Sequence, residues 1–279
     1  IDAPLALCIA TRGSEVVVLD SGYVDSEMAA QFGVEGYTEY DTLFSQLGLN
    51  LEDVQHVFLG HLHWDHAGGT RRFPNAKFVV QQRELEFAAG RMPSDETARM
   101  GFTAADIVDL VKLNWEGRVR LVDGDVNSLL PGLNVFLTAG HTIETMTTCL
   151  ETVKGRVCYA SDAVYLYRNI EQDVPLGVAL DSDQSVESYA KIRQVVGDGT
   201  LIPSHDPVIF SRPEDFGFRR ISDSIIAIVE EHLAVAAEQA DEAASRLRHP
   251  QLIGGPLDTP LVVKEREQRI SLPGSLRRA

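Results

Sequence analysis

Nine consecutive residues constrain this chain more than any other feature: HLHWDHAGG, from His61 to Gly69. Three of the eight histidines and one aspartate lie within six positions here, directly after the run VQHVFLG, which is typical of a strand. Side chains two positions apart on an extended chain point the same way, so His61 and His63 can converge on one metal ion. Asp65 and His66 follow as the chain turns and can reach a second point nearby. A merely polar loop does not account for this crowding, and we expect a metal site.

Further metal-type ligands follow three later strands of the expected fold. The apolar runs LNVFLT, RVCYA and TLI are each followed within a few residues by such a side chain: His141, Asp162 and His205, respectively. In each case an apolar strand ends and delivers a ligand, so the strand ends could converge on one edge of a sheet sandwich. Imidazole and carboxylate donors without a thiolate suit Zn²⁺, and also Fe or Mn.

In their order and spacing, these residues resemble the metallo-β-lactamase superfamily, over roughly residues 4–212. The resemblance implies an α/β fold, an αβ/βα sandwich of two mixed sheets flanked by helices, with two Zn²⁺ ions per chain (or Fe or Mn) at one edge. Superfamily members that carry out diiron redox chemistry have Glu at the position of His63, which favours hydrolysis here. By position, the resemblance implies seven ligands: His61, His63 and His141 for the first metal, Asp65, His66 and His205 for the second, and Asp162 bridging both.

Within the superfamily, several stretches are similar to the N-acyl-homoserine lactone lactonase group, among them HLHWDHAGG, FVVQQRELEFA and SDAVYLYRNIEQDVPLG. In the last, Tyr165 stands three residues after Asp162, as in that group, where the phenol contacts the substrate carbonyl region and helps to stabilise the oxyanion. A core tyrosine is the plainer alternative, and Tyr167 competes for the role. Trp64 stands where the lactonases often have Phe or Tyr, so we expect it to line the site.

The resemblance therefore implies a dinuclear-zinc hydrolase that opens a lactone ring, either an N-acyl-homoserine lactone or another small lactone. We expect a hydroxide held between the metals to attack the carbonyl, while Tyr165 and the second metal stabilise the oxyanion. Asp65 is expected to pass a proton to the leaving alkoxide. Asp162 is expected to bridge the metals and offset part of their charge.

Two departures from the lactonases bear on the substrate. The chain has Glu144, in HTIETMTT, where the lactonases usually have glycine, which alters the local turn and the pocket wall. The segment that precedes PLAL in the lactonases and lines the acyl pocket is absent, so the sequence does not set an acyl preference. The alternatives are a hydrolase of another cyclic ester, amide or thioester, similar to glyoxalase II, and an oxidoreductase with one iron, similar to the persulfide dioxygenases. A non-enzymatic binding module is a further alternative, against which the seven intact ligands argue.

The composition limits the classes of partner that we expect the protein to bind. The formal charge of −16 disfavours binding to nucleic acid and to anionic membranes. No apolar stretch is long enough to span a membrane, and the start of the chain is not typical of a signal peptide. Cys149 and Cys158 lie in apolar stretches and, like Cys8, form no C-x-x-C pair, so we expect buried thiols and a reducing, cytoplasmic setting.

The pattern of apolar residues changes after Pro213. We expect a catalytic domain over residues 1–212 and a helical extension over residues 213–279. Apolar residues at helical spacing predict one long amphipathic helix from about Arg219 to His249, packed on its own domain or, as the next expectation, in a homodimer contact. Within the first domain, SVESYAKIRQVVG predicts a helix with Ser185 as its N-cap.

Overall fold

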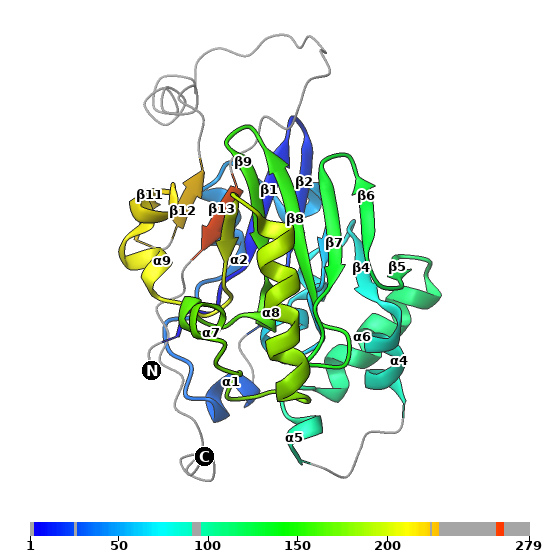
Figure 1. Ribbon diagram of the computed structural model, residues 1–279. Helices are drawn as coiled ribbons and strands as arrows, with labels where there is room; N and C mark the ends of the chain where they lie inside the picture. Colours follow the sequence, from blue (N-terminus) through cyan, green and yellow to red (C-terminus); the bar gives the residue numbers. More distant parts are fainter. Residues whose placement is uncertain (1–2, 25–26, 91–95, 224, 229–260, 265–279) are drawn as a thin grey trace.

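The protein is described by a computed structural model over residues 3–24, 27–90, 96–223, 225–228 and 261–264. Two β-sheets face each other, and helices lie against their outer faces (Figure 1). In the described part of the chain the larger sheet has the strand order β11-β12-β13-β1-β2-β3-β4-β5, and the smaller sheet has the order β10-β9-β8-β7-β6. Both sheets are mixed, because β2 to β5 are parallel neighbours and β9 pairs in parallel with β10.

The strands are short. Those of the larger sheet are β1 (Cys8–Arg12), β2 (Glu15–Leu19), β3 (Val54–Phe58), β4 (Lys77–Gln81), β5 (Val119–Val122), β11 (Arg219–Ser222), β12 (Ile225–Ile228) and β13 (Leu261–Lys264). Those of the smaller sheet are β6 (Val126–Leu130), β7 (Leu133–Leu137), β8 (Met146–Thr152), β9 (Gly155–Tyr159) and β10 (Thr200–Ile202).

The helices are distributed over both outer faces and the connecting loops. Their bounds are α1 (Glu27–Gln31), α2 (Tyr40–Ser45), α3 (Trp64–Ala67), α4 (Gln82–Ala89), α5 (Glu96–Arg99), α6 (Ala104–Trp115), α7 (Tyr167–Gln172), α8 (Ser182–Val196) and α9 (Val208–Ser211). Short 3₁₀ turns lie at Leu51–Asp53, Thr70–Arg72, Ser161–Ala163 and Pro213–Phe216.

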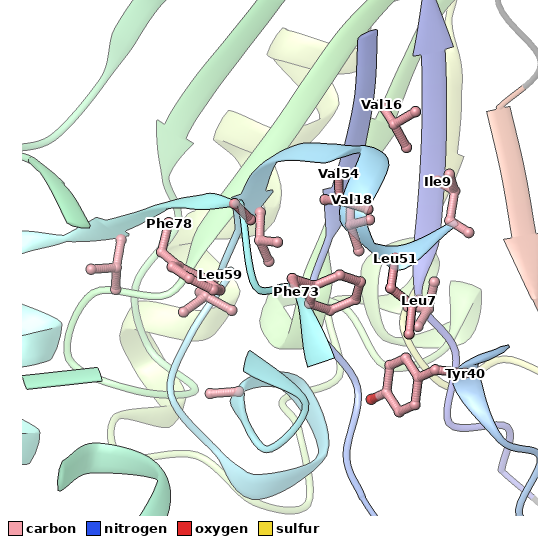
Figure 2. Packing of buried hydrophobic residues seen from close by; sticks show 14 of the residues in the cluster. Leu7, Ile9, Val16, Val18, Tyr40, Leu51, Val54, Leu59, Phe73 and Phe78 are labelled. Atoms are coloured by element: carbon pink, nitrogen blue, oxygen red, sulfur yellow. The ribbon is translucent and has the colours of Figure 1, made fainter. Parts of the chain in front are cut away.

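The period-two alternation of the strands produces two separate cores around the larger sheet. On β2, Val17 and Leu19 face the smaller sheet and pack with its residues. Val16 and Val18 face the other way and pack in a cluster with residues of helices α2, α4 and α6. Phe73 and Phe78 belong to the same cluster (Figure 2). Helix α8 covers the outer face of the smaller sheet. The expected αβ/βα sandwich of two mixed sheets is therefore confirmed.

The expected long C-terminal helix is wrong over residues 219–228. Ile221 and Ile225, the first two apolar positions of its pattern, lie on the strands β11 and β12. Ile225–Ile228 is rich in β-branched residues, which favour strands, and it pairs antiparallel with β13. The rest of the expected helix lies outside the described residues. The division of the chain at residue 212 and the homodimer contact stay predictions.

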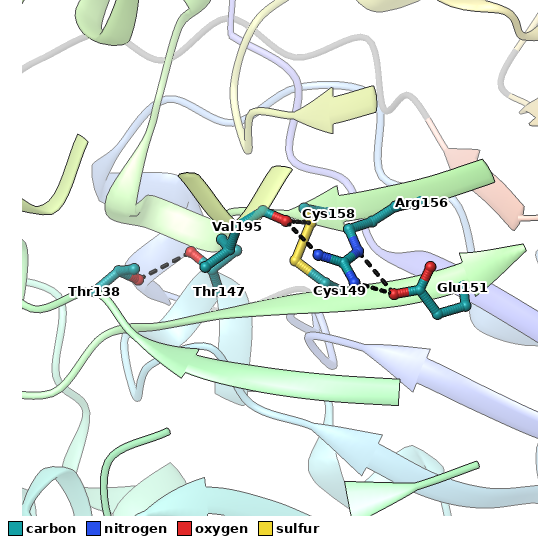
Figure 3. Close-up of a disulfide and its surroundings, with 7 residues drawn as sticks. All are labelled: Thr138, Thr147, Cys149, Glu151, Arg156, Cys158 and Val195. Carbon is teal, nitrogen blue, oxygen red and sulfur yellow. Dashed lines mark hydrogen bonds and ion pairs between the residues drawn. A yellow bond between two sulfur atoms is a disulfide. The ribbon is translucent and has the colours of Figure 1, made fainter. Parts of the chain in front are cut away.

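The expected thiols of Cys149 and Cys158 are instead joined in a disulfide between paired residues of β8 and β9 (Figure 3). Both residues are buried as expected, but neighbouring antiparallel strands bring the two side chains together, which their spacing in sequence did not reveal. Cys8 is a buried free thiol. Because the expectation of a reducing setting depended on three thiols, the structure removes its main support.

Helix α8 begins four residues earlier than an N-cap at Ser185 implies: its N-cap is Asp181, whose carboxylate accepts the N–H of Gln184. Among the described residues, no helix is both long and apolar enough to cross a membrane.

Candidate metal centre

All seven predicted ligands come together at one edge of the sandwich, in the loops that follow strands. His61 and His63 lie in the loop after β3, and Asp65 and His66 lie in α3. The remaining three follow β7, β9 and β10: His141, Asp162 and His205. The strand β3 ends at Phe58, before the first two histidines, but the expected alternation persists because Leu62 between them is buried in the core.

The ligand atoms form two groups that share one carboxylate. In each group the atoms all lie within 4.8 Å of one another: His61, His63, His141 and Asp162 in the first, and Asp65, His66, His205 and Asp162 in the second.

The shared Asp162 presents one oxygen to each group. Its Oδ2 is 3.2 Å from His141 Nε2 and 3.6 Å from His61 Nε2. Its Oδ1 is 3.0 Å from His66 Nε2 and 2.9 Å from His205 Nε2. This side chain therefore stands where a bridging ligand would stand.

The donor set fits two metal ions. His141 Nε2 lies 3.0 Å from His63 Nδ1 and 3.2 Å from His61 Nε2, so three imidazole nitrogens converge on one point. His66 Nε2 and Asp162 Oδ1 are buried and make no hydrogen bond. Buried polar atoms without partners are costly, and a cation between them would satisfy both. Nitrogen and carboxylate donors without thiolate are those that zinc, iron or manganese accept.

The two groups differ in charge. Burial, reinforced by the neighbouring histidines, lowers the pKa of His61 well below its usual value and that of His63 to about 3, so both rings are neutral, which is the form that binds metal. Burial would also lower the pKa of His66, but Asp162, Asp65 and Asp20 outweigh it and raise the pKa well above its usual value. The carboxylates around His66 thus favour a positive charge there: a proton in the metal-free chain, which a metal ion must displace to use the ring as a ligand.

Hydrogen bonds behind the rings set which nitrogen faces the centre. His141 Nδ1 lies 2.8 Å from Val178 O, and His205 Nδ1 lies 2.8 Å from Pro4 O. A ring that donates from Nδ1 keeps Nε2 free as a ligand atom. His63 is the exception, because its Nδ1 faces His141.

Two residues that the sequence did not indicate, Asp20 and Ser161, support the ligands from behind. Asp20 Oδ2 lies 2.6 Å from His66 Nδ1 and accepts the Ser161 hydroxyl at 2.7 Å, while Oδ1 accepts the Gly60 N–H at 2.6 Å. Ser161 Oγ also lies 3.3 Å from His61 Nδ1. Both residues have positive φ, 58° and 47°, an uncommon conformation outside glycine that tends to occur at functional sites. Asp20 follows the strand EVVVL, and a position after a strand is the same signal that identified the ligands.

Tyr165 lies directly beside the ligands, and Tyr167 does not. The Tyr165 hydroxyl is 3.3 Å from His141 Nδ1, and its ring contacts those of His141 and His205 edge-on, with ring centres 5.4 and 5.1 Å apart. Tyr167 instead stacks on Phe216 and donates its hydroxyl to Leu201 O. The structure therefore places Tyr165, and not Tyr167, against the ligands, and the role of Tyr165 stays a prediction.

Trp64 does not lie where the sequence analysis expected. Its side chain is 5% exposed and packs against Tyr23 and Phe32 in a separate apolar cluster. A small cavity does adjoin His63 and His141, but Phe87, Phe102 and Ile143 supply its apolar wall. We therefore interpret Trp64 as a packing residue at the start of α3.

Comparisons with known proteins agree with this geometry. Residues 6–205 match the model of the metallo-beta-lactamase superfamily. Over 156 residues the chain is 30% identical to an N-acyl homoserine lactonase of Bacillus cereus, and over 165 residues it is 29% identical to the N-acyl homoserine lactonase AttM of Rhizobium radiobacter. The aligned part covers 56% of this chain and 56% of the first relative, and 58% of this chain and 61% of the second.

A solved structure has the same fold. It is that of an N-acyl homoserine lactone hydrolase with the product N-hexanoyl-L-homoserine bound at its catalytic metal centre. It superimposes with a TM-score of 0.62 at 21% identity, covering 79% of this chain and 86% of that one. With the family model matching residues 6–205 and the ligands gathered at one edge of two packed sheets, the chain belongs to the metallo-β-lactamase superfamily.

Proposed function

We propose that this protein is a dinuclear-zinc hydrolase that opens a lactone ring, with N-acyl-homoserine lactones as the first substrates to test. The observation that carries the proposal is the position of Tyr165, whose ring lies between His141 of the first ligand group and His205 of the second. Relatives named as N-acyl homoserine lactonases support the choice of substrate class.

Two zinc ions, when bound, would polarise a substrate carbonyl and lower the pKa of water, so that a nucleophile exists at neutral pH. Among the described residues, the serines next to the ligands have hydroxyls committed elsewhere: Ser161 donates to Asp20, Ser21 to His66 O and Ser204 to Val164 O. This is consistent with hydrolysis without a covalent intermediate on the protein.

Tyr165 is suited to donate a hydrogen bond to the oxygen on which charge develops. Burial, with the charges of Asp162 and Asp65, raises its pKa well above the usual value, so the phenol keeps its proton at neutral pH. A fixed donor in a buried site stabilises an oxyanion much more than the same donor in water. We assign Tyr165 this role.

Asp162 and Asp65 would have different roles in the reaction. Burial would raise the pKa of Asp162, but the surrounding histidines, His66 first, hold it well below its usual value, so it stays charged. Asp65 Oδ2 lies 3.4 Å from His66 Nε2 and 3.8 Å from His205 Nε2, at the margin of the second group. It is 11% exposed, against 3% for Asp162, so we assign it the transfer of a proton to the leaving alkoxide.

The complete second ligand group favours hydrolysis over oxygen chemistry at a single iron. Asp65, His66 and His205 have no function as ligands in a mononuclear centre, yet all three face Asp162. Phe87, Phe102 and Ile143 give the small cavity beside His63 an apolar wall that an uncharged acyl group could contact. Among the described residues, no lysine or arginine lines that cavity, which disfavours an anionic thioester.

The test is a substrate panel with metal analysis. The full chain, loaded with zinc, is assayed with N-acyl-homoserine lactones, plain lactones, a glutathione thioester and a lactam. We expect two zinc ions per chain and the highest kcat/KM on a lactone, with loss of activity in Asp162→Ala. The exposed Asp183→Asn serves as a control that keeps activity. Turnover of the thioester alone would contradict the proposal, as would an inactive protein with both metals bound.

A further inference from the structure

One buried carboxylate joins the two segments that carry the first ligand group. Glu84, in the first turn of α4, is fully buried. Its Oε1 accepts the N–H of Leu62 at 3.3 Å, and its Oε2 accepts the N–H of Glu144 at 3.0 Å. Leu62 lies between His61 and His63, and Glu144 lies three residues after His141. The spacing of these segments is therefore fixed by a single rigid group.

Glu144 in turn binds Arg83, the residue before Glu84. Its Oε2 accepts the N–H of Arg83 at 2.8 Å, and its Oε1 lies 3.6 Å from Arg83 Nη1. Arg83 precedes Glu84 in the first turn of α4, where backbone N–H groups have no partner within the helix and negative charge is favourable. Glu84 and Glu144 thus anchor each other's segments, and we call them the crossed glutamates.

Burying the carboxyl groups of the crossed glutamates costs free energy. Burial raises the pKa of both carboxyls, and the N–H donors of Glu144 and Leu62 on Glu84, and of Arg83 on Glu144, oppose that rise. A buried acid without such donors would destabilise the fold, whereas an apolar side chain would pack without this cost. What an apolar side chain cannot do is hold two backbone N–H groups at a set separation.

We propose that Glu84 and Glu144 are positioning residues that hold His61 and His63 in register with His141 and so determine the affinity of the first metal site. A glycine at position 144 would leave the Arg83 N–H at the start of α4 without this cap. The proposal depends on metal binding and not on the identity of the substrate.

The experiment measures metal affinity in the full chain. Glu84→Ala, Glu84→Gln, Glu144→Ala and Glu144→Gln are titrated with Zn²⁺ against a competing chelator and with Co²⁺ by visible absorption. The control is Glu86→Ala, because Glu86 is an exposed residue of the same helix whose carboxylate contacts only Gln82 among the described hydrogen bonds.

We expect Glu84→Ala to weaken one of the two metal equivalents about 10- to 100-fold, the effect typical of losing a group that orients ligands. The Co²⁺ spectrum of that site should change while Glu86→Ala matches the unmodified chain. Glu144→Gln keeps an oxygen that can accept the Arg83 N–H, so its affinity should exceed that of Glu144→Ala. Glu84→Gln, which keeps one acceptor for two donors, should be intermediate.

The outcomes distinguish a role of the crossed glutamates in positioning the ligands from a role in stabilising the fold alone. If Glu84→Ala lowers Tm but keeps the affinity and Co²⁺ spectrum of the unmodified chain, the proposal is wrong. If Glu84→Ala does not fold, the Glu144 pair decides, and equal affinities of Glu144→Ala and Glu144→Gln overturn the proposal. A chain that binds metal and separates these variants but opens no lactone would instead contradict the proposed function alone.

Discussion

His66 Nδ1 lies 2.6 Å from Asp20 Oδ2, and this contact turns the opposite nitrogen of the ring towards Asp162, 3.0 Å away. The carboxylate that orients the ring is itself fixed, because it also accepts the Ser161 hydroxyl and the Gly60 N–H. The geometry of the second ligand group therefore depends on a residue that binds no metal. Partners of this kind commonly affect metal affinity nearly as much as the ligands do.

Asp20→Asn should weaken the metal at the second group about 10- to 100-fold. The asparagine oxygen can still accept the Gly60 N–H, but its NH₂ group cannot accept from His66 or Ser161. Asparagine tolerates the positive φ of this position, so backbone strain is not the cause. Chelator competition measures the effect, with Asp41→Asn, an exposed partner of Arg72, as the control. Equal affinities in the two variants would show that Asp20 does not orient His66.

Tyr165→Phe should lower kcat about 10²- to 10³-fold, as removal of one oxyanion donor does elsewhere, while the metal content stays at two per chain. The matched control is Tyr167→Phe, whose lost hydroxyl bonded Leu201 O, away from the ligands. That variant should lose about 1 kcal/mol of unfolding free energy and keep its kcat. An equal fall in kcat for both variants contradicts the assignment of Tyr165.

Gly101→Ala should displace His63. A Cβ at Gly101 would lie 2.6 Å from His63 Cγ, whereas a Cβ at Gly117 would meet nothing within 4 Å. Both glycines have positive φ, 87° and 72°, so either substitution should cost about 1–2 kcal/mol in unfolding free energy. Only Gly101→Ala should weaken metal binding at the first group. If Gly117→Ala weakens it equally, the effect comes from general destabilisation.

The disulfide predicts a thiol count. When the unreduced chain is unfolded and its thiols are titrated, we expect one reactive thiol, that of Cys8, and three after reduction. Cys149→Ala should leave two thiols without reduction. Three thiols in the unreduced chain would contradict the bond between β8 and β9.

The sequence identified the seven ligands because each follows a strand whose apolar residues are easy to recognise. The same rule would have found Asp20 after EVVVL, but one carboxylate has no spacing signal that separates it from a turn residue. Glu84 and Glu144 could not be found this way, because Glu84 accepts backbone N–H groups 22 and 60 residues away and Glu144 accepts one 61 residues away.

Two errors have a common physical origin in pairing between strands. The spacing of Ile221 and Ile225 fits a helix, yet these residues form β11 and β12 because β13, far along the chain, offers a partner edge. Cys149 and Cys158 meet for the same reason, across β8 and β9.

Trp64 was placed in the pocket by analogy, but its ring turns into the cluster with Tyr23 and Phe32. Periodicity records local preference, and these outcomes depend on distant partners.

The most direct test is a titration of the metal-free chain with Zn²⁺ while lactone hydrolysis is followed. The two ligand groups joined by Asp162 predict that activity rises with added metal and reaches its maximum at two equivalents per chain. Maximal activity at one equivalent, or no lactone hydrolysis with two equivalents bound, would contradict a dinuclear lactone hydrolase.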